Sequence, residues 1–319
     1  MRKKLYIFAI IFSLFVAGCT NKEEIDDSKI NVVTSFYPMY VATSNIVDGV
    51  SDVSLSNLTA ATTGCLHDYQ ITTADMIKLS KADILVINGD GMENFIQKAI
   101  STYPELDIIN ASEGIKENHE EILGIHEENE TIHVNEESGE KEDEHSHEHG
   151  ENSHYWVSIS LYIEQIKNIK DGLIKLNPEN KEKYEENAQN YIEKLELLKA
   201  QMHEKLDDVE NKKIVTFHEA FEYFAEEFDL EIAAVIEREP GTYPSSRDLA
   251  RIVDLIGEKD IKAIFVEPQY SRSAADTIAQ ETGIKVYTLD PIVTGKLSKD
   301  SYINIMQKNL EVLEEALGE

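Results

Sequence analysis

The chain has 319 residues, of which 61 are acidic and 30 are basic, and its formal net charge at pH 7 is −31. A surface this acidic repels the phosphates of nucleic acids, so we expect no nucleic-acid partner. The chain is longer than one small hydrophobic core requires, and this length predicts two domains of ordinary size.

The N-terminus has the pattern of a bacterial lipoprotein signal peptide. Basic residues at 2–4 precede an apolar run at 5–16, which is shorter than a typical membrane span. Two small residues and Cys19 follow, so we predict that residues 1–18 are removed and that Cys19 is lipidated. The polar stretch 19–29 would then be a tether that holds the protein outside the cell, at the outer face of the bacterial cell membrane. An ordinary secretory signal or an uncleaved anchor is the alternative.

Strand-like and helix-like segments alternate over residues 30–112. β-Branched and apolar runs predict four strands, and amphipathic spacing predicts three helices, one of them capped by Thr72 or Thr73. Connections of this length are typical of parallel β-α-β units, so this half is expected to be an α/β lobe. The expected strands are 30–35, 50–59, 82–89 and 106–112, and the expected helices are 36–49, 72–82 and 92–100.

Residues 113–151 interrupt this alternation. The segment contains fifteen acidic residues and six histidines, and it has no sustained apolar period with which to bury a core. We predict a mobile, His-rich acidic loop that gathers zinc loosely, with His145, His147 and His149 as its densest part. A solvated insertion with no specific role is the alternative.

The rest of the chain is predicted to form two helices and then to repeat the strand–helix alternation. Residues 158–176 have apolar residues at three- and four-residue steps, and residues 179–209 contain strong helix formers without glycine or proline. A helix of that length would be roughly 45 Å long, so we expect two Rossmann-like α/β lobes joined by one rigid spine helix. The expected second-lobe strands are 212–217, 230–236, 261–270 and 285–291, and the helices are 218–228, 245–260, 271–283 and 298–317. The expected domains are an N-terminal lobe at 30–177, a linking helix at 178–210 and a C-terminal lobe at 211–319.

Three histidines and one aspartate are candidate metal ligands. They are His67 in GCLHDYQ, His154 in SHYWVS, His218 in VTFHEAF and Asp290 in YTLDP. His154 opens a predicted helix, and the other three follow predicted strands, where ligands gather in open α/β sheets. Three imidazoles and one carboxylate are a normal shell for a divalent transition metal, above all zinc. The sequence therefore predicts a metal site in the cleft between the two lobes.

Residues near these motifs leave alternatives open. Asp290 could instead cap a turn before the following proline. Glu267 lies at the end of a predicted strand. It either orients a metal ligand without contacting the metal itself or belongs to a turn. Cys65 has no disulfide partner if Cys19 is lipidated, so it is either a thiolate ligand or, as we favour, a small buried thiol. His203, inside the charged spine helix, is interpreted as a surface residue or a hydrogen-bonded core residue and not as a ligand.

These motifs resemble those of the ZnuA/TroA-like solute-binding lipoproteins of bacterial ABC transporters. The resemblance covers the whole mature chain and includes VVTSFYPMY, LHDYQITTADMIKLSKADILVINGDGMENF, HYWVSIS, TFHEAFEYFAEEFDL, EPGTYPSSRDLARIVDLI, FVEPQYS and YTLDP. It implies two α/β lobes with the metal between them, and the ligands His67, His154, His218 and Asp290. Histidine at the third position, where manganese-type members tend to have glutamate, favours Zn²⁺ over Mn²⁺. The family often has an acidic residue before the first histidine, whereas this chain has Cys65 there, which leaves Asp290 as the fourth ligand.

The resemblance implies a binding protein that captures Zn²⁺ and delivers it to an ABC permease for uptake, and we expect it to be a monomer. A secreted zinc hydrolase is the main rival class. The motif that begins at His218 is HExxE, which lacks the second histidine of HExxH, and a fourth protein ligand would fill the position that a catalytic zinc keeps for water. We therefore predict no enzymatic activity and no catalytic residues. A surface adhesin or a zinc-buffering lipoprotein is the third alternative.

Overall fold

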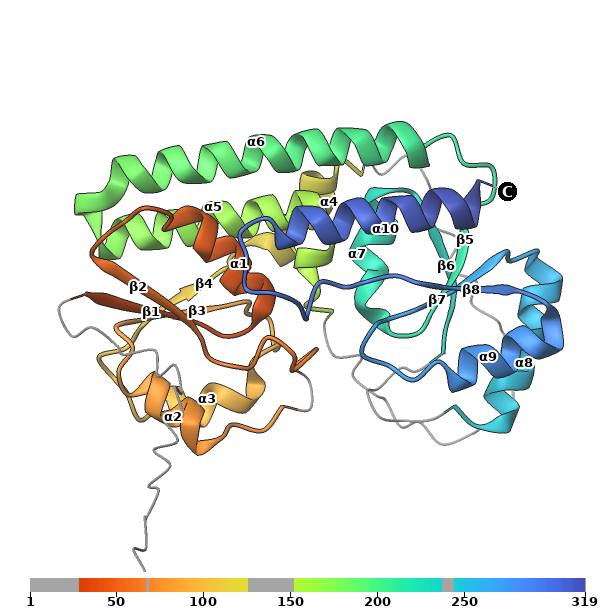
Figure 1. Cartoon of the computed structure of the whole chain (residues 1–319), viewed down its shortest axis with the longest axis horizontal. Helices are drawn as coiled ribbons and strands as arrows, with labels where there is room; N and C mark the ends of the chain where they lie inside the picture. The colour runs from red at the N-terminus through yellow and green to blue at the C-terminus, as the bar shows by residue number, and fades with distance from the viewer. Residues whose placement is uncertain (1–28, 67–68, 126–151, 237–243, 319) are drawn as a thin grey trace, which may run out of the picture.

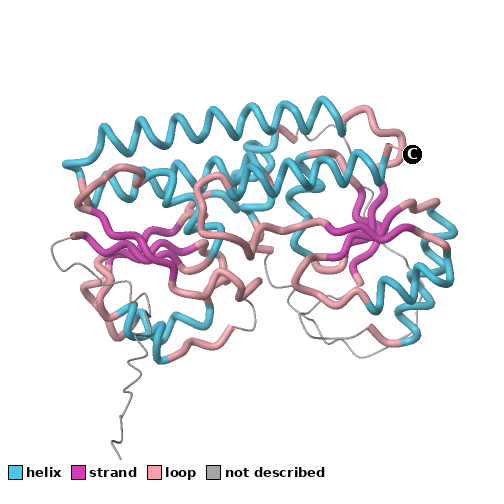
Figure 2. Tube along the Cα trace, viewed as in Figure 1, coloured by secondary structure: helices cyan, strands magenta, loops and turns pink. Residues whose placement is uncertain are grey.

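Two parallel sheets organise the computed structural model, which describes residues 29–66, 69–125, 152–236 and 244–318. Each sheet has four strands in the same order, β2-β1-β3-β4 in the first and β6-β5-β7-β8 in the second. Figure 2 shows the two sheets in separate halves of the molecule, with helices around them. This arrangement confirms the predicted α/β fold with two lobes. The strands are β1 (Ile30–Thr34), β2 (Val53–Asn57), β3 (Ile84–Ile87), β4 (Asp107–Asn110), β5 (Lys213–Thr216), β6 (Glu231–Val235), β7 (Ala263–Val266) and β8 (Lys285–Thr288).

The strand order reverses between the two central strands of each sheet. In the second sheet these are β5 and β7, which pair in parallel with Val215 opposite Ile264. At such a reversal the loops after the two strands leave toward opposite faces, and the space between them is where α/β sheets bind ligands. His218 follows β5 and Glu267 follows β7. Both predicted site residues therefore lie at this reversal.

Helices cover both faces of the first sheet (Figure 1). Helix α2 begins with a capping box, because the Thr72 hydroxyl accepts from the Asp75 backbone N–H while the Asp75 carboxylate accepts from the Thr72 N–H. The single helix predicted at 92–100 is instead a 3₁₀ turn followed by one α-helical turn. The helices of this lobe are α1 (Tyr37–Ile46), α2 (Thr73–Leu79), η1 (Asn94–Ile96), α3 (Gln97–Ile100) and α4 (Ile115–Leu123).

Helix α4 corrects our expectation that residues 113–151 lack regular structure. It lies between Gly114 and Gly124, which both adopt the left-handed conformation that ends helices. On its inner side Ile115 joins a buried cluster with Leu161 of the following long helix, and Leu123 packs against it. These few apolar side chains among many carboxylates give no clear period, so the helix depends on the surface against which it packs.

The remainder of that segment, residues 126–151, lies outside the described residues. It includes His145, His147 and His149, so their role in gathering zinc stays a prediction. The lipidation site Cys19 also lies outside the described residues. In the part of the chain that is described, no helix is long and apolar enough to cross a membrane.

Two long antiparallel helices run beside the lobes. Helices α5 (Ile159–Leu176) and α6 (Lys181–Leu206) pack along each other and are separated by the short turn η3 (Pro178–Asn180). The 26 residues of α6 correspond to a length of about 39 Å. Figure 1 shows α6 extending along one side of the molecule, over both lobes. This confirms the predicted long helix.

The last helix returns to the first lobe. Helix α10 (Ser301–Leu317), which we expected within the C-terminal lobe, packs on β8 and also on α6 and α1. Its Tyr302 stacks on Tyr162 of α5, with ring centroids 4.0 Å apart. One hydrophobic cluster therefore runs through both lobes. The other helices of the second half are η4 (Glu219–Phe221), α7 (Glu222–Glu227), α8 (Ser246–Lys259) and α9 (Ser273–Thr282).

A buried carboxylate also fastens the second lobe to α5. Glu227, at the end of α7, accepts hydrogen bonds from the backbone N–H groups of Ile159 at 2.7 Å and Ser160 at 3.0 Å. These N–H groups have no partner within the helix, and a negative charge at a helix N-terminus is stabilising. Helix α5 begins shortly after His154, so the contact also holds the segment that carries a predicted metal ligand.

The contact between α5 and the first sheet depends on a glycine. A Cβ atom added to Gly172 would lie 2.8 Å from two carbons of the Ile109 side chain, which is buried and stiff about χ1. We expect Gly172→Ala to lower the free energy of unfolding by about 1–3 kcal/mol, because overpacking outweighs the gain in helix propensity. Chemical unfolding followed by circular dichroism would measure this change.

Gly257 in α8 is the matched control for this substitution. A Cβ atom there would meet nothing within 4 Å. Gly257→Ala is therefore expected to raise the free energy of unfolding by about 0.5–1 kcal/mol through helix propensity alone. A stabilising effect at both positions would show that α5 does not pack tightly on β4.

Candidate metal centre

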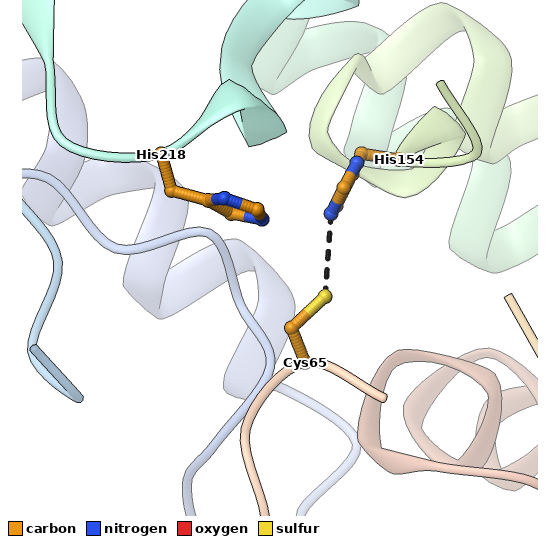
Figure 3. Close-up of side chains that lie close together, drawn as sticks. All are labelled: Cys65, His154 and His218. Atoms are coloured by element: carbon orange, nitrogen blue, oxygen red, sulfur yellow. Dashed lines mark hydrogen bonds between the residues drawn. The ribbon is translucent and has the colours of Figure 1, made fainter. Parts of the chain in front are cut away.

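Cys65, His154 and His218 come together between the two lobes (Figure 3). One donor atom from each residue, a sulfur or a ring nitrogen, lies within 4.8 Å of the other two. Cys65 belongs to the connection between β2 and α2, His218 follows β5, and His154 precedes the 3₁₀ turn η2 (Tyr155–Val157) and α5. The fold thus joins two of the predicted ligands, His154 and His218, with a residue that we had not favoured as a ligand.

The tautomer of His154 follows from its contacts. Its Nδ1 lies 2.7 Å from the Oδ1 atom of Asn152. The Asn152 amide nitrogen donates to the Glu219 carbonyl and to the Glu222 carboxylate, so the orientation of this amide is determined by its partners. An amide oxygen only accepts hydrogen bonds, so Nδ1 carries the proton and Nε2 presents a lone pair. This is the usual arrangement of a metal-binding histidine, whose second nitrogen donates to a neighbour.

The His154 segment is held from both lobes. Asn88, just beyond β3, donates from its amide nitrogen to the Ser153 carbonyl at 2.9 Å. On the other side, the Trp156 indole donates to the Pro291 carbonyl at 2.7 Å, and the Tyr302 hydroxyl donates to the Trp156 carbonyl at 2.9 Å. A ligand held this way keeps its direction when no metal is bound.

His218 is placed by the end of β5. Its backbone is extended, and the residue precedes the turn η4. The side chain is 1% exposed, and its ring centroid lies 5.2 Å from that of His154 and 5.9 Å from that of Tyr270. An imidazole enclosed by other rings lies in a medium of low dielectric, where its bond to a cation is stronger than in water.

Cys65 differs from our favoured prediction of a small buried thiol. It forms no disulfide and is only partly buried. Its sulfur lies 3.2 Å from the Nε2 atom of His154. Because Nε2 is the unprotonated nitrogen, the thiol donates to it. The sulfur and this lone pair therefore face the same small region.

Asp290 lies outside this group of three. Its Oδ1 accepts a hydrogen bond from the Ile292 backbone N–H at 2.8 Å, which is the turn-capping role that we kept as an alternative. The Asn309 side chain bonds to both backbone groups of Asp290. Burial raises the pKa of the Asp290 carboxyl, and the Ile292 N–H partly opposes this rise. The structure thus shows Asp290 as a turn residue, and its ligand role stays a prediction.

The two remaining predicted site residues lie on loops of this region. Glu267 is 1% exposed, and its carboxylate accepts from the Gln269 amide nitrogen at 2.5 Å. Gln269 in turn approaches Gly64 of the first lobe, next to Cys65. His67 lies outside the described residues, two positions after Cys65.

Comparison with known proteins identifies the family. A family model described as "Zinc-uptake complex component A periplasmic" (ZnuA) matches residues 32–316. The chain belongs to the ZnuA family. The family consists of solute-binding proteins of zinc transport and not of enzymes, which confirms our choice against a zinc hydrolase.

Two relatives and one solved structure illustrate what this chain is similar to. The high-affinity zinc uptake system protein ZnuA of Bacillus subtilis is 32% identical, over 98% of this chain and 97% of that protein. The zinc-binding lipoprotein AdcA of Streptococcus pneumoniae is 30% identical, and the match spans 99% of this chain but only 61% of AdcA. The laminin binding protein Lmb of Streptococcus agalactiae has a similar structure, with a TM-score of 0.72 and 26% identity over 90% of this chain and 99% of that one. Lmb is described as bifunctional, with adhesin and metal transporting activity.

Sequence reasoning missed Asn152 and Trp156, which position the predicted ligand His154. Asn152 orients His154 and ties it to the start of η4, directly after His218. Trp156 lies with its ring centroid 5.2 Å from that of His154. Both residues are two positions from His154 in the sequence, so their closeness along the chain could have identified them as residues that position His154. An asparagine with its side chain folded back two residues is a common local turn, and it could have been proposed from the sequence.

Proposed function

We propose that this protein captures Zn²⁺ outside the cytoplasm and delivers it to an ABC permease for uptake. The observation that carries the proposal is the grouping of the buried His154 and His218 with Cys65 where the two lobes meet. Nitrogen and sulfur donors are preferred by Zn²⁺, whereas Mn²⁺ prefers oxygen donors. Membership of a zinc-uptake family supports the same cargo.

The proposed ligands are drawn from both lobes. His67, His154 and His218 hold the ion, and the fourth position is open to Asp290, which the family resemblance implies. The segment of Asp290 is bonded to Trp156, two residues after His154, which supports a place for it near the site. Glu267 is proposed to help position the site without contacting the ion, through its hydrogen bond with Gln269.

Delivery requires that the protein stay beside its permease. ZnuA-family proteins work with ABC permeases. We propose that lipid on Cys19 holds this protein, as a monomer, at the outer face of the bacterial cell membrane. The signal pattern in the sequence supports the anchor, and so does the name of AdcA as a lipoprotein.

Adhesion is a second candidate function, because Lmb is described as both adhesin and metal transporter. Zinc accumulation by cells that lack this protein separates the two functions. Lower accumulation, restored by the gene, supports transport. Normal accumulation with weaker attachment of the cells to laminin supports adhesion.

A competitive zinc titration of the full chain tests the proposal. A chelating dye of known affinity competes with the protein, and elemental analysis counts the bound metal. We expect one tight Zn²⁺ per chain, held in preference to Mn²⁺. The comparison variant replaces the five histidines of 126–151 by asparagine, namely His126, His133, His145, His147 and His149.

The comparison variant separates the two proposed zinc sites. If the group between the lobes is the site, the tight zinc survives in this variant and only weaker binding is lost. Disappearance of the tight zinc would mean that the His-rich segment is the site and that the protein is a zinc buffer. Tight Mn²⁺ in place of Zn²⁺ would overturn the proposed cargo.

A further inference from the structure

We propose that Cys65 is a ligand of the metal ion, so that this site binds its cargo through a thiolate as well as imidazoles. The inference rests on the proposed function, because it concerns the same site. It reverses our interpretation of Cys65 from the sequence.

The distances fit a shared metal ion. In a tetrahedral zinc site with bonds of about 2.3 Å to sulfur and about 2.0 Å to nitrogen, neighbouring donors lie about 3.3–3.6 Å apart. The Cys65 sulfur is already 3.2 Å from the Nε2 atom of His154. The donor of His218 is within 4.8 Å of both, so a shift of at most about 1.5 Å brings it into range.

The direction of the donors fits as well. The Asn152 amide oxygen keeps the His154 proton on Nδ1, so the Nε2 lone pair points toward the Cys65 sulfur. In Figure 3 the three side chains converge from three separate segments of the backbone. When a cation replaces the thiol proton, the sulfur and the nitrogen lone pair both face it without a change of rotamer.

The Cys65 loop is held in place from both lobes. Leu66 is buried in the main hydrophobic cluster. The Gly295 N–H, from the loop after β8, donates to the Ala61 carbonyl at 3.0 Å. Gly64 adopts a φ of +85°, which is easy for glycine and turns the chain just before the cysteine. These contacts pre-position the sulfur, so little freedom is lost when the metal binds.

A sulfur ligand also adds a donor to the shell. Structural zinc sites usually hold four protein ligands, and Cys65 raises the number that the described residues bring together from two to three. Asp290 is then left in the turn where its Oδ1 accepts from the Ile292 N–H. A thiolate raises the preference for soft, tetrahedral cations such as Zn²⁺ and Cd²⁺ over Mn²⁺.

Cobalt absorption tests the inference directly, because a thiolate bound to Co²⁺ gives an intense charge-transfer band in the near ultraviolet that imidazole and carboxylate ligands do not give. We expect the full chain loaded with Co²⁺ to show this band and Cys65→Ser to lose it. The chain has two cysteines, so Cys19→Ser is the matched control and is expected to keep the band. We expect the zinc affinity of Cys65→Ser to fall at least about 10- to 100-fold. Removing a residue that only hydrogen-bonds to a metal ligand typically causes a loss of that size.

The outcomes separate the two proposals. One bound Co²⁺ without the charge-transfer band, together with unchanged zinc affinity in Cys65→Ser, overturns the role of Cys65 and leaves the proposed function intact. A band that persists in Cys65→Ser and disappears in Cys19→Ser also overturns it. Failure of the unaltered chain to hold Zn²⁺ or Co²⁺ contradicts the proposed function itself.

Discussion

Replacing His218 by alanine is expected to weaken zinc binding by about 10³-fold, which corresponds to about 4 kcal/mol. The side chain is buried, and it is the proposed ligand that the second lobe contributes to the group with Cys65 and His154. Without it the ion loses one strong donor. Competitive titration against a chelating dye would measure the change in Kd.

His203→Ala is the matched control for this prediction. His203 lies on α6 and is partly exposed, with its Nδ1 atom 2.9 Å from the Asp207 carboxylate and its ring centroid 4.8 Å from that of Phe228. Its replacement should leave the zinc affinity unchanged. Zinc should also raise the thermal stability of this control as it does that of the unaltered chain, because a ligand that binds only the folded state stabilises it. Equal zinc affinity in His218→Ala and in the control would remove His218 from the site.

Replacing Trp156 by alanine is expected to have the largest effect on stability, about 3–5 kcal/mol. The indole is fully buried and contacts Phe36 edge to face, with ring centroids 5.0 Å apart. Its loss leaves a cavity between the lobes and removes the hydrogen bond to the Pro291 carbonyl. Urea unfolding followed by far-ultraviolet circular dichroism would measure the change, because Trp156 is the only tryptophan of the chain.

The milder variant Trp156→Phe separates packing from hydrogen bonding. It keeps most of the apolar contact but leaves the Pro291 carbonyl without its donor, so we expect a loss of about 1–3 kcal/mol. The alanine variant should also bind zinc more weakly, because the His154 segment is no longer held. If both variants unfold at the same urea concentration as the unaltered chain, this account of the interface between the lobes is wrong.

The elements of the fold were predictable where local signals agreed. Long α6 has strong helix formers and no glycine or proline, and α2 has its capping residues Thr72 and Asp75. Such signals act over a few residues, so they can be seen in a single sequence. Helix α4 was not predicted from the sequence, because its stability comes from Ile115 and neighbouring apolar side chains that pack on another element.

The candidate site was predictable only in part. His154 and His218 stood out because imidazoles at strand ends and helix starts in an α/β chain are typical of metal sites. The proximity of Cys65 to His154 was not predicted, because 89 residues separate the two along the chain. Nothing in either motif states that the two loops meet. Likewise Asp290 looked like a ligand from its place after a strand, whereas its contact with Ile292 is a matter of local turn geometry.

The sequence by itself determined the fold class, the long helix and the presence of candidate metal ligands, because these follow from local periodicity and from the chemistry of the side chains. Only the tertiary structure decided which donors face one another. That choice depends on how α5, α10 and the loops lock the two lobes together, with Trp156 and Tyr302 at their junction. A shift of a few ångströms in this packing would not change the pattern of any motif, yet it would decide whether the sulfur of Cys65 or the carboxylate of Asp290 reaches the ion.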